Sequence, residues 1–274
     1  MMVEALVYFF VPALVGVLIG IASGLLGIGG GTVMVPIFRL AFGMSATMST
    51  ATSLFAIIPT SISGAISHVK GKTCIPALGI AAGLGGACMS PIGVWLAQLS
   101  PDWLVMLAAA LIIGYSAINM FKKAFKLRPA GQPAAGGDAA APTADDSSLS
   151  RKQLLQGAAI GLVAGLASGY VGVGGGFIMV PLMLSIIGIP MRKASGTSLI
   201  AVMILAIPGV IEQGIIGNIN YLAGIAIVIG TIPGAVIGAR LVTKVPERTL
   251  RLLFGCFLIV AAVMLVLNEV GIFG

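Results

Sequence analysis

Two glycine-rich runs, with hydroxyl side chains beside them, are the part of this chain best suited to bind a ligand. The first occupies residues 20–36 with consecutive glycines at 29–31, and the second occupies residues 165–181 with consecutive glycines at 174–176. Both runs interrupt apolar segments of membrane-span character. Glycine clusters break helices, and a bilayer tolerates the freed N–H and C=O groups only where protein or a water-filled cavity covers them. The paired runs therefore predict a binding site at matching positions of two halves, the arrangement typical of transporters.

The chemistry of these residues favours an anion. A helix that begins at Thr32 or Phe177 presents unpaired N–H groups and a partial positive charge of about half a unit, and glycines let the backbone approach an oxyanion closely. No Lys or Arg lies in the middle of an expected span, so neutral donors must hold the charge. The candidate substrate-binding residues are Ser23, Gly27, Gly29, Gly30, Gly31, Thr32, Thr52, Ser53, Ser168, Gly172, Gly174, Gly175, Gly176, Phe177, Thr197 and Ser198.

The composition places the elements that carry these residues in a membrane. The chain is 58% hydrophobic and 8% charged, whereas soluble domains average about 45–50% apolar and about 25% charged residues. We expect a multi-pass protein of the cell membrane, with the basic residues in short loops rather than on a nucleic-acid surface. The cysteines at 74, 88 and 256 lie within or beside apolar spans, and we expect them to be small buried hydrophobes rather than disulfides or metal ligands.

A duplication organises the whole chain. An offset of 145 residues aligns residues 16–107 with 161–252 without a gap, and it matches glycines, prolines and the Thr-Ser-Leu at 52–54 with that at 197–199. The sequence predicts a first transmembrane repeat at 1–128, a flexible cytoplasmic linker at 129–150 and a second transmembrane repeat at 151–274. We expect packing roles for a set of other glycines, namely Gly20, Gly64, Gly79, Gly93, Gly209, Gly224 and Gly238.

Each half holds four long apolar stretches and one short one. The long stretches are 5–26, 46–66, 74–97 and 103–121 in the first half and 153–172, 194–213, 221–240 and 250–270 in the second; the short stretches are 32–42 and 177–187. If all ten cross the membrane, five crossings per half invert the second repeat relative to the first. Nearly all basic residues then fall on the cytoplasmic side, as the positive-inside rule requires.

The expected fold is therefore all-α, with two inverted five-segment repeats and both termini extracytoplasmic. One difficulty concerns the short segment 32–42, which reaches only about half of the roughly 20 residues that a span needs. Either the first helix unwinds early, near Ser23 or Gly24, or residues 43–48 complete the crossing in extended form.

A few polar residues break the repeat. Tyr115, Ser116 and Asn119 have the apolar counterparts Val260, Ala261 and Met264, which indicates a polar face in the first half only. The single histidine, His68, stands beside Lys70 and Lys72 at an expected helix end, where an interfacial position is favoured over proton transport.

The repeated Gly-x-x-Gly-x-Gly-Gly-Gly, followed by a short Val-Met-Val-Pro-type helix, resembles the TauE/SafE sulfite and sulfonate exporter family, also called the toluene-sulfonate uptake permease (TSUP) family. The motif residues are Gly24, Gly27, Gly29, Gly30, Gly31 and Pro36 with Gly169, Gly172, Gly174, Gly175, Gly176 and Pro181, together with residues 51–54 and 196–199. The resemblance covers essentially the whole chain apart from the linker. It implies transport of small sulfur-containing anions, chiefly sulfite and organosulfonates.

The function expected from these observations is secondary transport of such an anion. Carriers coupled to protons or sodium usually keep carboxylates in the membrane, and here only Glu212 is a candidate, so we expect an anion that leaves a cell that is negative inside. A channel-like conduit for small anions is the alternative, and a membrane-embedded enzyme is a weaker one, because no catalytic pair or metal cluster is apparent. No cofactor or metal is expected; the partners are the anionic substrate and the lipid bilayer, with homo-oligomer formation left open.

Overall fold

The computed structural model describes residues 2–126 and 150–269, and within them the chain is helical and contains no strand. The first half comprises α1 (Met2–Leu26), α2 (Gly31–Phe42), α3 (Ala46–Lys70), α4 (Pro76–Leu99) and α5 (Asp102–Lys126). The second half comprises α6 (Arg151–Val171), α7 (Gly176–Leu182), the π-helical η2 (Met183–Ile187), α8 (Met191–Ile216), α9 (Tyr221–Leu241) and α10 (Glu247–Glu269). Of the expected linker at 129–150, only Ser150 falls within the described residues.

The length and composition of the helices confirm a polytopic membrane protein. Seven described helices are long and apolar enough to cross a bilayer, and three shorter apolar helices accompany them, Pro12–Leu26, Gly31–Phe42 and Gly176–Ile187. The short segments expected after each glycine run are thus present as α2 and as α7 with η2. Large apolar side chains on the outer faces of the long helices are exposed, which suits contact with lipid.

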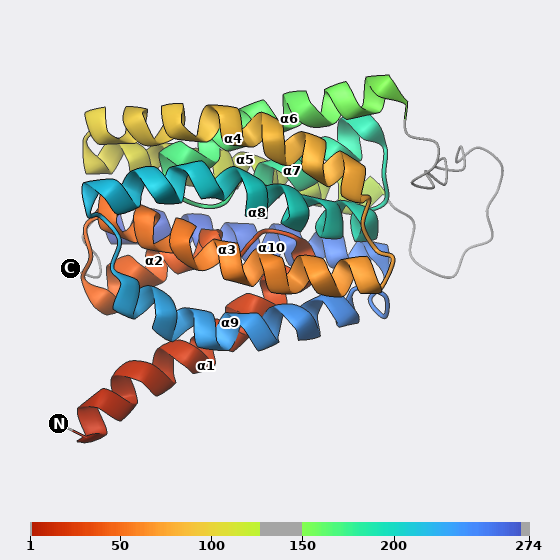
Figure 1. Cartoon of the computed structure of the whole chain (residues 1–274). Helices are drawn as coiled ribbons and strands as arrows, with labels where there is room; N and C mark the ends of the chain where they lie inside the picture. Colours follow the sequence, from red (N-terminus) through yellow and green to blue (C-terminus); the bar gives the residue numbers. More distant parts are fainter. Residues whose placement is uncertain (1, 127–149, 270–274) are drawn as a thin grey trace.

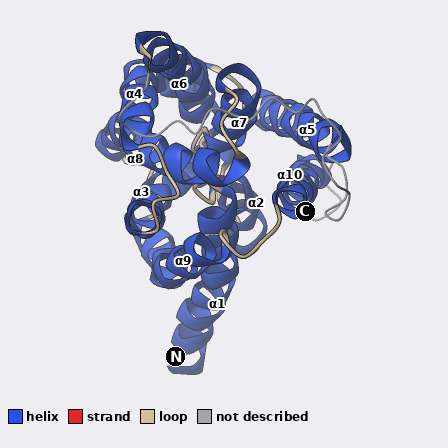
Figure 2. Cartoon of the chain, turned by 90° about the vertical axis from the view of Figure 1, so that its right-hand side faces the viewer, coloured by secondary structure: helices blue, strands red, loops and turns tan. Residues whose placement is uncertain are grey.

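The first helix of each half packs against the fourth helix of the other half. Helix α1 lies along α9, α6 lies along α4, and α5 pairs with α10. Figure 2, which views the molecule roughly along its helices, places the α4–α6 and α1–α9 pairs at opposite edges, with α2 and α7 between them. The 145-residue offset exchanges the two edge pairs, since α4 corresponds to α9 and α1 to α6. The contact pattern therefore follows the sequence duplication.

Glycines let these edge pairs approach closely. Gly16, Gly20 and Gly24 recur every fourth residue on α1, and a side chain on any of them would collide with the backbone of α9. On α6 the residues at 161, 165 and 169 collide in the same way with α4. Of the seven glycines expected to serve packing, Gly20, Gly93 and Gly238 lie in these edge pairs. The other four, Gly64, Gly79, Gly209 and Gly224, lie closely against neighbouring helices, so all seven have the expected packing position.

Two acidic residues at the starts of α5 and α10 hold the starts of α3 and α8. Asp102 accepts a hydrogen bond from the N–H of Ala46 (3.2 Å), and Glu247 accepts one from the N–H of Met191 (3.2 Å). Both acceptors and both donors are related by the offset of 145. A carboxylate near a helix N-terminus satisfies an otherwise unpaired N–H and favours the helix dipole, so the duplicated contact positions the helices that flank the glycine runs.

The structure contradicts both expectations for how the chain around the short segment 32–42 completes its crossing of the membrane. Helix α1 continues to Leu26 without unwinding at Ser23 or Gly24, and only residues 43–45 separate α2 from α3. The Gly24 carbonyl contacts the His68 ring near the end of α3, while Gly29 lies beside Ile57 and Ser61, at the middle of α3. The glycine turn thus re-enters the molecule, and α2, about 18 Å long, covers the remaining half of the way back.

The expectation for the cysteines needs a correction. Cys74 is half-buried, whereas Cys88 and Cys256 are exposed on the surfaces of α4 and α10. Both side chains lie within membrane-spanning helices. The surrounding hydrocarbon, rather than the protein interior, therefore suits these small apolar side chains.

A candidate anion site at the paired glycine turns

Each glycine run forms a left-handed turn between two helices. Gly27, Gly29 and Gly30 have φ of 75°, 79° and 85°, and their counterparts at 172, 174 and 175 have φ of 73°, 85° and 68°. Side chains are strained in this region of backbone conformation, and glycine is not. The two turns therefore share one backbone path, and the glycine pattern is explained by it.

The two turns contact each other at the centre of the molecule. A Cβ atom on Gly31 would lie 2.5 Å from the carbonyl oxygen of Val173, and one on Gly176 would overlap the carbonyl oxygen of Gly27. Ile57 of α3 and Val202 of α8 are repeat counterparts, both fully buried, and each lies against Gly29 and Gly174. The residues that the sequence pairs across 145 positions are thus brought to one place, with two apolar side chains between them.

The turns present a set of N–H groups without acceptors. Within the described residues, nothing accepts a hydrogen bond from the N–H groups of residues 29–32. The N–H groups of residues 174, 175 and 177 in the second turn also have no acceptor there. Gly176 differs, because its N–H donates to the carbonyl of Gly174 (2.8 Å). Buried N–H groups are rarely left unpaired in folded proteins, so seven of them around one point favour an anionic ligand.

Buried hydroxyl groups add to this set. Ser23 and Ser168 are repeat counterparts, and neither hydroxyl has a hydrogen-bond partner in the described structure; the same is true of Thr32 and Ser53. Ser61, which the sequence analysis missed, is another such hydroxyl, and its Oγ lies 3.4 Å from the Cβ position of Gly29. Its spacing could have revealed it, because residues 53, 57 and 61 recur every fourth residue on one face of α3.

Three expected substrate hydroxyls have structural partners. Thr197 accepts a hydrogen bond from the N–H of Ile75 at the start of α4 (2.9 Å), and Thr52 accepts one from the N–H of Asn220 at the start of α9 (3.0 Å). Ser198 donates to the carbonyls of Gly27 (2.7 Å) and Ser195 (2.8 Å). These contacts fasten neighbouring helices and the first glycine turn. The hydroxyls of Thr52 and Thr197 accept here and keep their O–H donors, so their contact with the substrate stays a prediction.

We expect Thr197→Val to reduce stability more than affinity. Valine keeps the shape but removes the acceptor, and the buried N–H of Ile75 is left unpaired at a cost of about 1–3 kcal/mol. Thermal unfolding of the purified variant should shift downward, while Thr197→Ser, which keeps the hydroxyl, should unfold like the wild type. An unchanged unfolding temperature together with weakened anion binding would assign Thr197 to the ligand instead.

His68 has a structural contact that the sequence did not reveal. Its side chain is fully buried rather than interfacial. Nε2 lies 2.8 Å from the Gly24 carbonyl and Nδ1 lies 2.7 Å from the Thr73 hydroxyl. The counterpart of His68 is Gln213, which accepts a hydrogen bond from Asn218, the counterpart of Thr73 (2.8 Å). His68 therefore holds the end of α1 just before the first glycine turn.

Metal-binding chemistry finds no support in the described residues. No group of three or more His, Cys, Asp or Glu side chains there could hold a metal ion. The polar atoms at the glycine turns are backbone N–H groups and hydroxyls, which suit the oxygens of a small anion better than a cation.

Comparison with known proteins agrees with the resemblance in the motif residues. The family model described as "Sulfite exporter TauE/SafE" matches residues 12–265. The chain is 28% identical to the "Probable membrane transporter protein YunE" of Bacillus subtilis, over 97% of this chain and 99% of that protein. It is 29% identical to a "Probable membrane transporter protein" of Haemophilus influenzae, over 93% of this chain and 97% of the relative. No solved structure matches. The chain therefore belongs to the TauE/SafE family of sulfite exporters, a family of membrane transport proteins rather than enzymes.

Proposed function

We propose that this protein is a secondary transporter that exports small sulfur-containing anions such as sulfite or organosulfonates. The anion binds between the two glycine turns, near the middle of the membrane. Backbone N–H groups of residues 29–32 and of 174, 175 and 177 hold its oxygens. The buried hydroxyls without partners, those of Ser23, Thr32, Ser53, Ser61 and Ser168, are the candidates to assist. The family of the chain and the names of its relatives support transport.

One observation supports the site above all others: unpaired N–H donors from both halves gather where the two turns touch. A sulfite or sulfonate group offers several acceptor oxygens and no donor, so it complements a ring of donors. The contribution of two helix N-termini adds a favourable potential for negative charge. No basic side chain is required, which agrees with the lack of Lys and Arg in the middle of the spans.

Close packing of the turns favours a carrier over a channel. Ile57 and Val202 fill the space beside both turns, and a Cβ on Gly29 would lie 2.9 Å from Val202 Cγ1. An anion therefore needs a rearrangement of the two halves to reach the donors, as alternating access requires. Electrogenic exit of an anion from a cell that is negative inside sets the direction of transport.

Transport in liposomes tests this function. Purified protein is reconstituted, and uptake of labelled sulfite is measured with and without unlabelled anion inside. A carrier should show saturable uptake that is accelerated by internal sulfite or methanesulfonate and less so by sulfate or acetate. Flux that rises linearly with concentration and shows no counterflow would support the channel-like alternative, and no flux of any anion would contradict transport of this class.

The inverted arrangement of the repeats is the second part of the proposal. Figure 1 supports it, because α1 and α6 begin at opposite ends of the molecule. We expect both termini outside and the loops around Lys70 and Arg248 inside, because this orientation puts the basic residues in the cytoplasm. Cysteine-accessibility labelling at these loops and at the termini checks it. Labelling of either terminus from the cytoplasmic side would overturn the five-plus-five topology.

A further inference from the structure

A cavity separate from the glycine turns opens between α4, α5, α6 and α7. Its volume is about 820 Å³, and none of residues 27–32 or 172–177 lines it. Its wall is largely apolar, with Ile112, Leu166, Ile178 and Leu182 among the lining side chains. A volume of this size accommodates a ligand much larger than sulfite. The cavity is therefore suited to a ligand other than the transported anion.

The cavity is open toward the bilayer. Two of its lining side chains, Tyr115 on α5 and Val163 on α6, are 68% and 57% exposed, and both stand within membrane-spanning helices. The outer surface of such helices faces hydrocarbon rather than water. A molecule that enters from the side between α5 and α6 must therefore come from the lipid phase.

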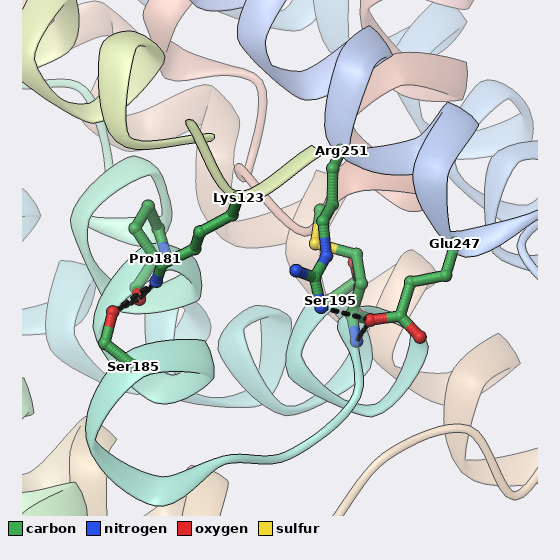
Figure 3. A network of polar contacts seen from close by, with 7 residues as sticks. Lys123, Pro181, Ser185, Ser195, Glu247 and Arg251 are labelled. Atoms are coloured by element: carbon green, nitrogen blue, oxygen red, sulfur yellow. Dashed lines mark hydrogen bonds and ion pairs between the residues drawn. The ribbon is translucent and has the colours of Figure 1, made fainter. Parts of the chain in front are cut away.

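One positive charge lies on the wall of this apolar cavity. Lys123, half-buried near the end of α5, donates to the Pro181 carbonyl (2.8 Å) and to the Ser185 hydroxyl (Figure 3). Among the described residues no carboxylate pairs with it. An ammonium group has three donors, so one N–H remains for a ligand.

The charges around Lys123 also favour an anion. Arg251 of α10 is close enough to interact electrostatically with Lys123, and Arg251 itself is paired with Glu247 at 2.5 Å (Figure 3). Lys122, the next residue along α5, is exposed. Glu247, the carboxylate that the described residues place near this cluster, is paired with Arg251, so the charge of Lys123 on the cavity wall is not neutralised by it.

The positive charge of the cavity and two of its polar side chains exist in one half only. Ser116, Asn119 and Lys123 line it, and the offset of 145 pairs them with Ala261, Met264 and Asn268. One of the two Lys123 hydrogen bonds goes to Ser185 of η2, which is a short π-helix, a form that is frequent at functional sites. The duplicated core does not require this asymmetry, so it indicates a separate binding function.

We propose that this cavity binds an anionic phospholipid of the bilayer. One acyl chain lies along the apolar wall between α5 and α6, and the phosphate accepts a hydrogen bond from Lys123. The chemistry required is an anionic head on an apolar chain, and the lateral opening assigns it to the membrane rather than to a soluble amphiphile. Basic pockets between membrane helices bind anionic headgroups in this way.

Binding of defined lipids to the purified full chain tests the proposal. Native mass spectrometry in detergent, with added phosphatidylglycerol or phosphatidylcholine of equal chain length, measures the preference for the anionic head. We expect phosphatidylglycerol to bind more tightly. Lys123→Gln should weaken its binding about fivefold, the effect of one basic residue on an anionic headgroup, and leave phosphatidylcholine unchanged.

Two further variants separate the site from general surface charge and from the shape of the cavity. Lys244→Gln removes the same charge from an exposed residue of the α9–α10 connection and should leave binding unchanged. Ala167→Phe fills the cavity wall and should weaken both lipids, with folding checked by circular dichroism. Equal affinities for the two lipids, or equal losses in the Lys123 and Lys244 variants, would overturn the proposal. Tight binding of decanesulfonate without any binding of phosphatidylglycerol would assign the cavity to a soluble amphiphile and contradict it.

Discussion

Replacing Gly161 with valine should prevent the protein from accumulating in folded form. A Cβ on Gly161 would overlap the carbonyl oxygen of Ala82 and lie 2.7 Å from its carbonyl carbon and 2.9 Å from its Cα. These atoms belong to the α4 backbone and cannot rotate away, so the whole α4–α6 pair must separate. Membrane helices associate through close packing of small residues, because lipid supplies no hydrophobic force between them.

The expected loss is at least about 3 kcal/mol, the upper part of the range for overpacked interiors. Size-exclusion chromatography of solubilised membranes, with a fluorescent fusion, measures the yield of monodisperse protein. Gly114→Val on α5 is the matched control, because a Cβ there meets nothing within 4 Å. The packing interpretation would be wrong if the Gly161 and Gly114 variants eluted and unfolded alike.

The same reasoning applies to the opposite edge of the molecule. Gly16 is the counterpart of Gly161, and its Cβ would overlap the carbonyl oxygen of Ile227 on α9. Gly16→Val should therefore show the same defect as Gly161→Val. Two equivalent defects at two separate edges would tie the effect to the duplicated helix contact rather than to one local collision.

Apolar length and glycine pattern were enough to predict most of the fold from the sequence. A stretch of about 20 apolar residues must form a spanning helix, and a triple glycine is unlike a packing motif, so the helices and the two breaks were expected in the right places. The path of the turn was not predictable. Whether the chain unwinds, extends or re-enters after Leu26 depends on what it meets in space, namely the His68 ring at one depth and Ile57 at another.

The candidate site shows the same limit. The sequence offered Thr52 and Thr197 as candidate hydroxyls, since the repeat pairs them, but it could not show that they accept hydrogen bonds from the N–H groups of Asn220 and Ile75. A hydroxyl binds whichever partner is nearest, and the nearest partner here comes from the fourth helix of the other half. Lys123 was missed for a related reason, because its position near a helix end is typical of a topology signal and its partners lie on α7 and η2 of the other half.

Valine at Gly30 or Gly175 should abolish anion binding by a folded protein. Both residues have positive φ, at 85° and 68°, where a β-branched side chain is strongly disfavoured. A Cβ on Gly30 would also lie 3.0 Å from Ile19 Cγ2 and 3.1 Å from Met34 Cε. Either effect moves the N–H groups that begin α2, and donors to an oxyanion act only at hydrogen-bond distance.

A control variant with the same backbone strain distinguishes the effect of strain on stability from the loss of the anion site. Gly188 also has positive φ, at 78°, but a Cβ there meets nothing within 4 Å, and the residue is exposed at the end of η2. Gly188→Val should therefore lose stability and keep affinity for sulfite, whereas Gly175→Val should lose affinity even where it remains folded.

Alanine keeps the test decisive if valine blocks folding. Gly30→Ala retains the left-handed strain at about 1–2 kcal/mol and adds only one carbon, so folded protein should be recovered. Its affinity for sulfite or methanesulfonate, measured by titration calorimetry in detergent, should fall about tenfold or more, which corresponds to at least ~1.4 kcal/mol. Because the proposed site takes donors from both turns, Gly175→Ala should weaken binding by a similar factor. Unchanged affinity in both alanine variants would place the anion away from the turns, since no arrangement of donors there could survive both displacements.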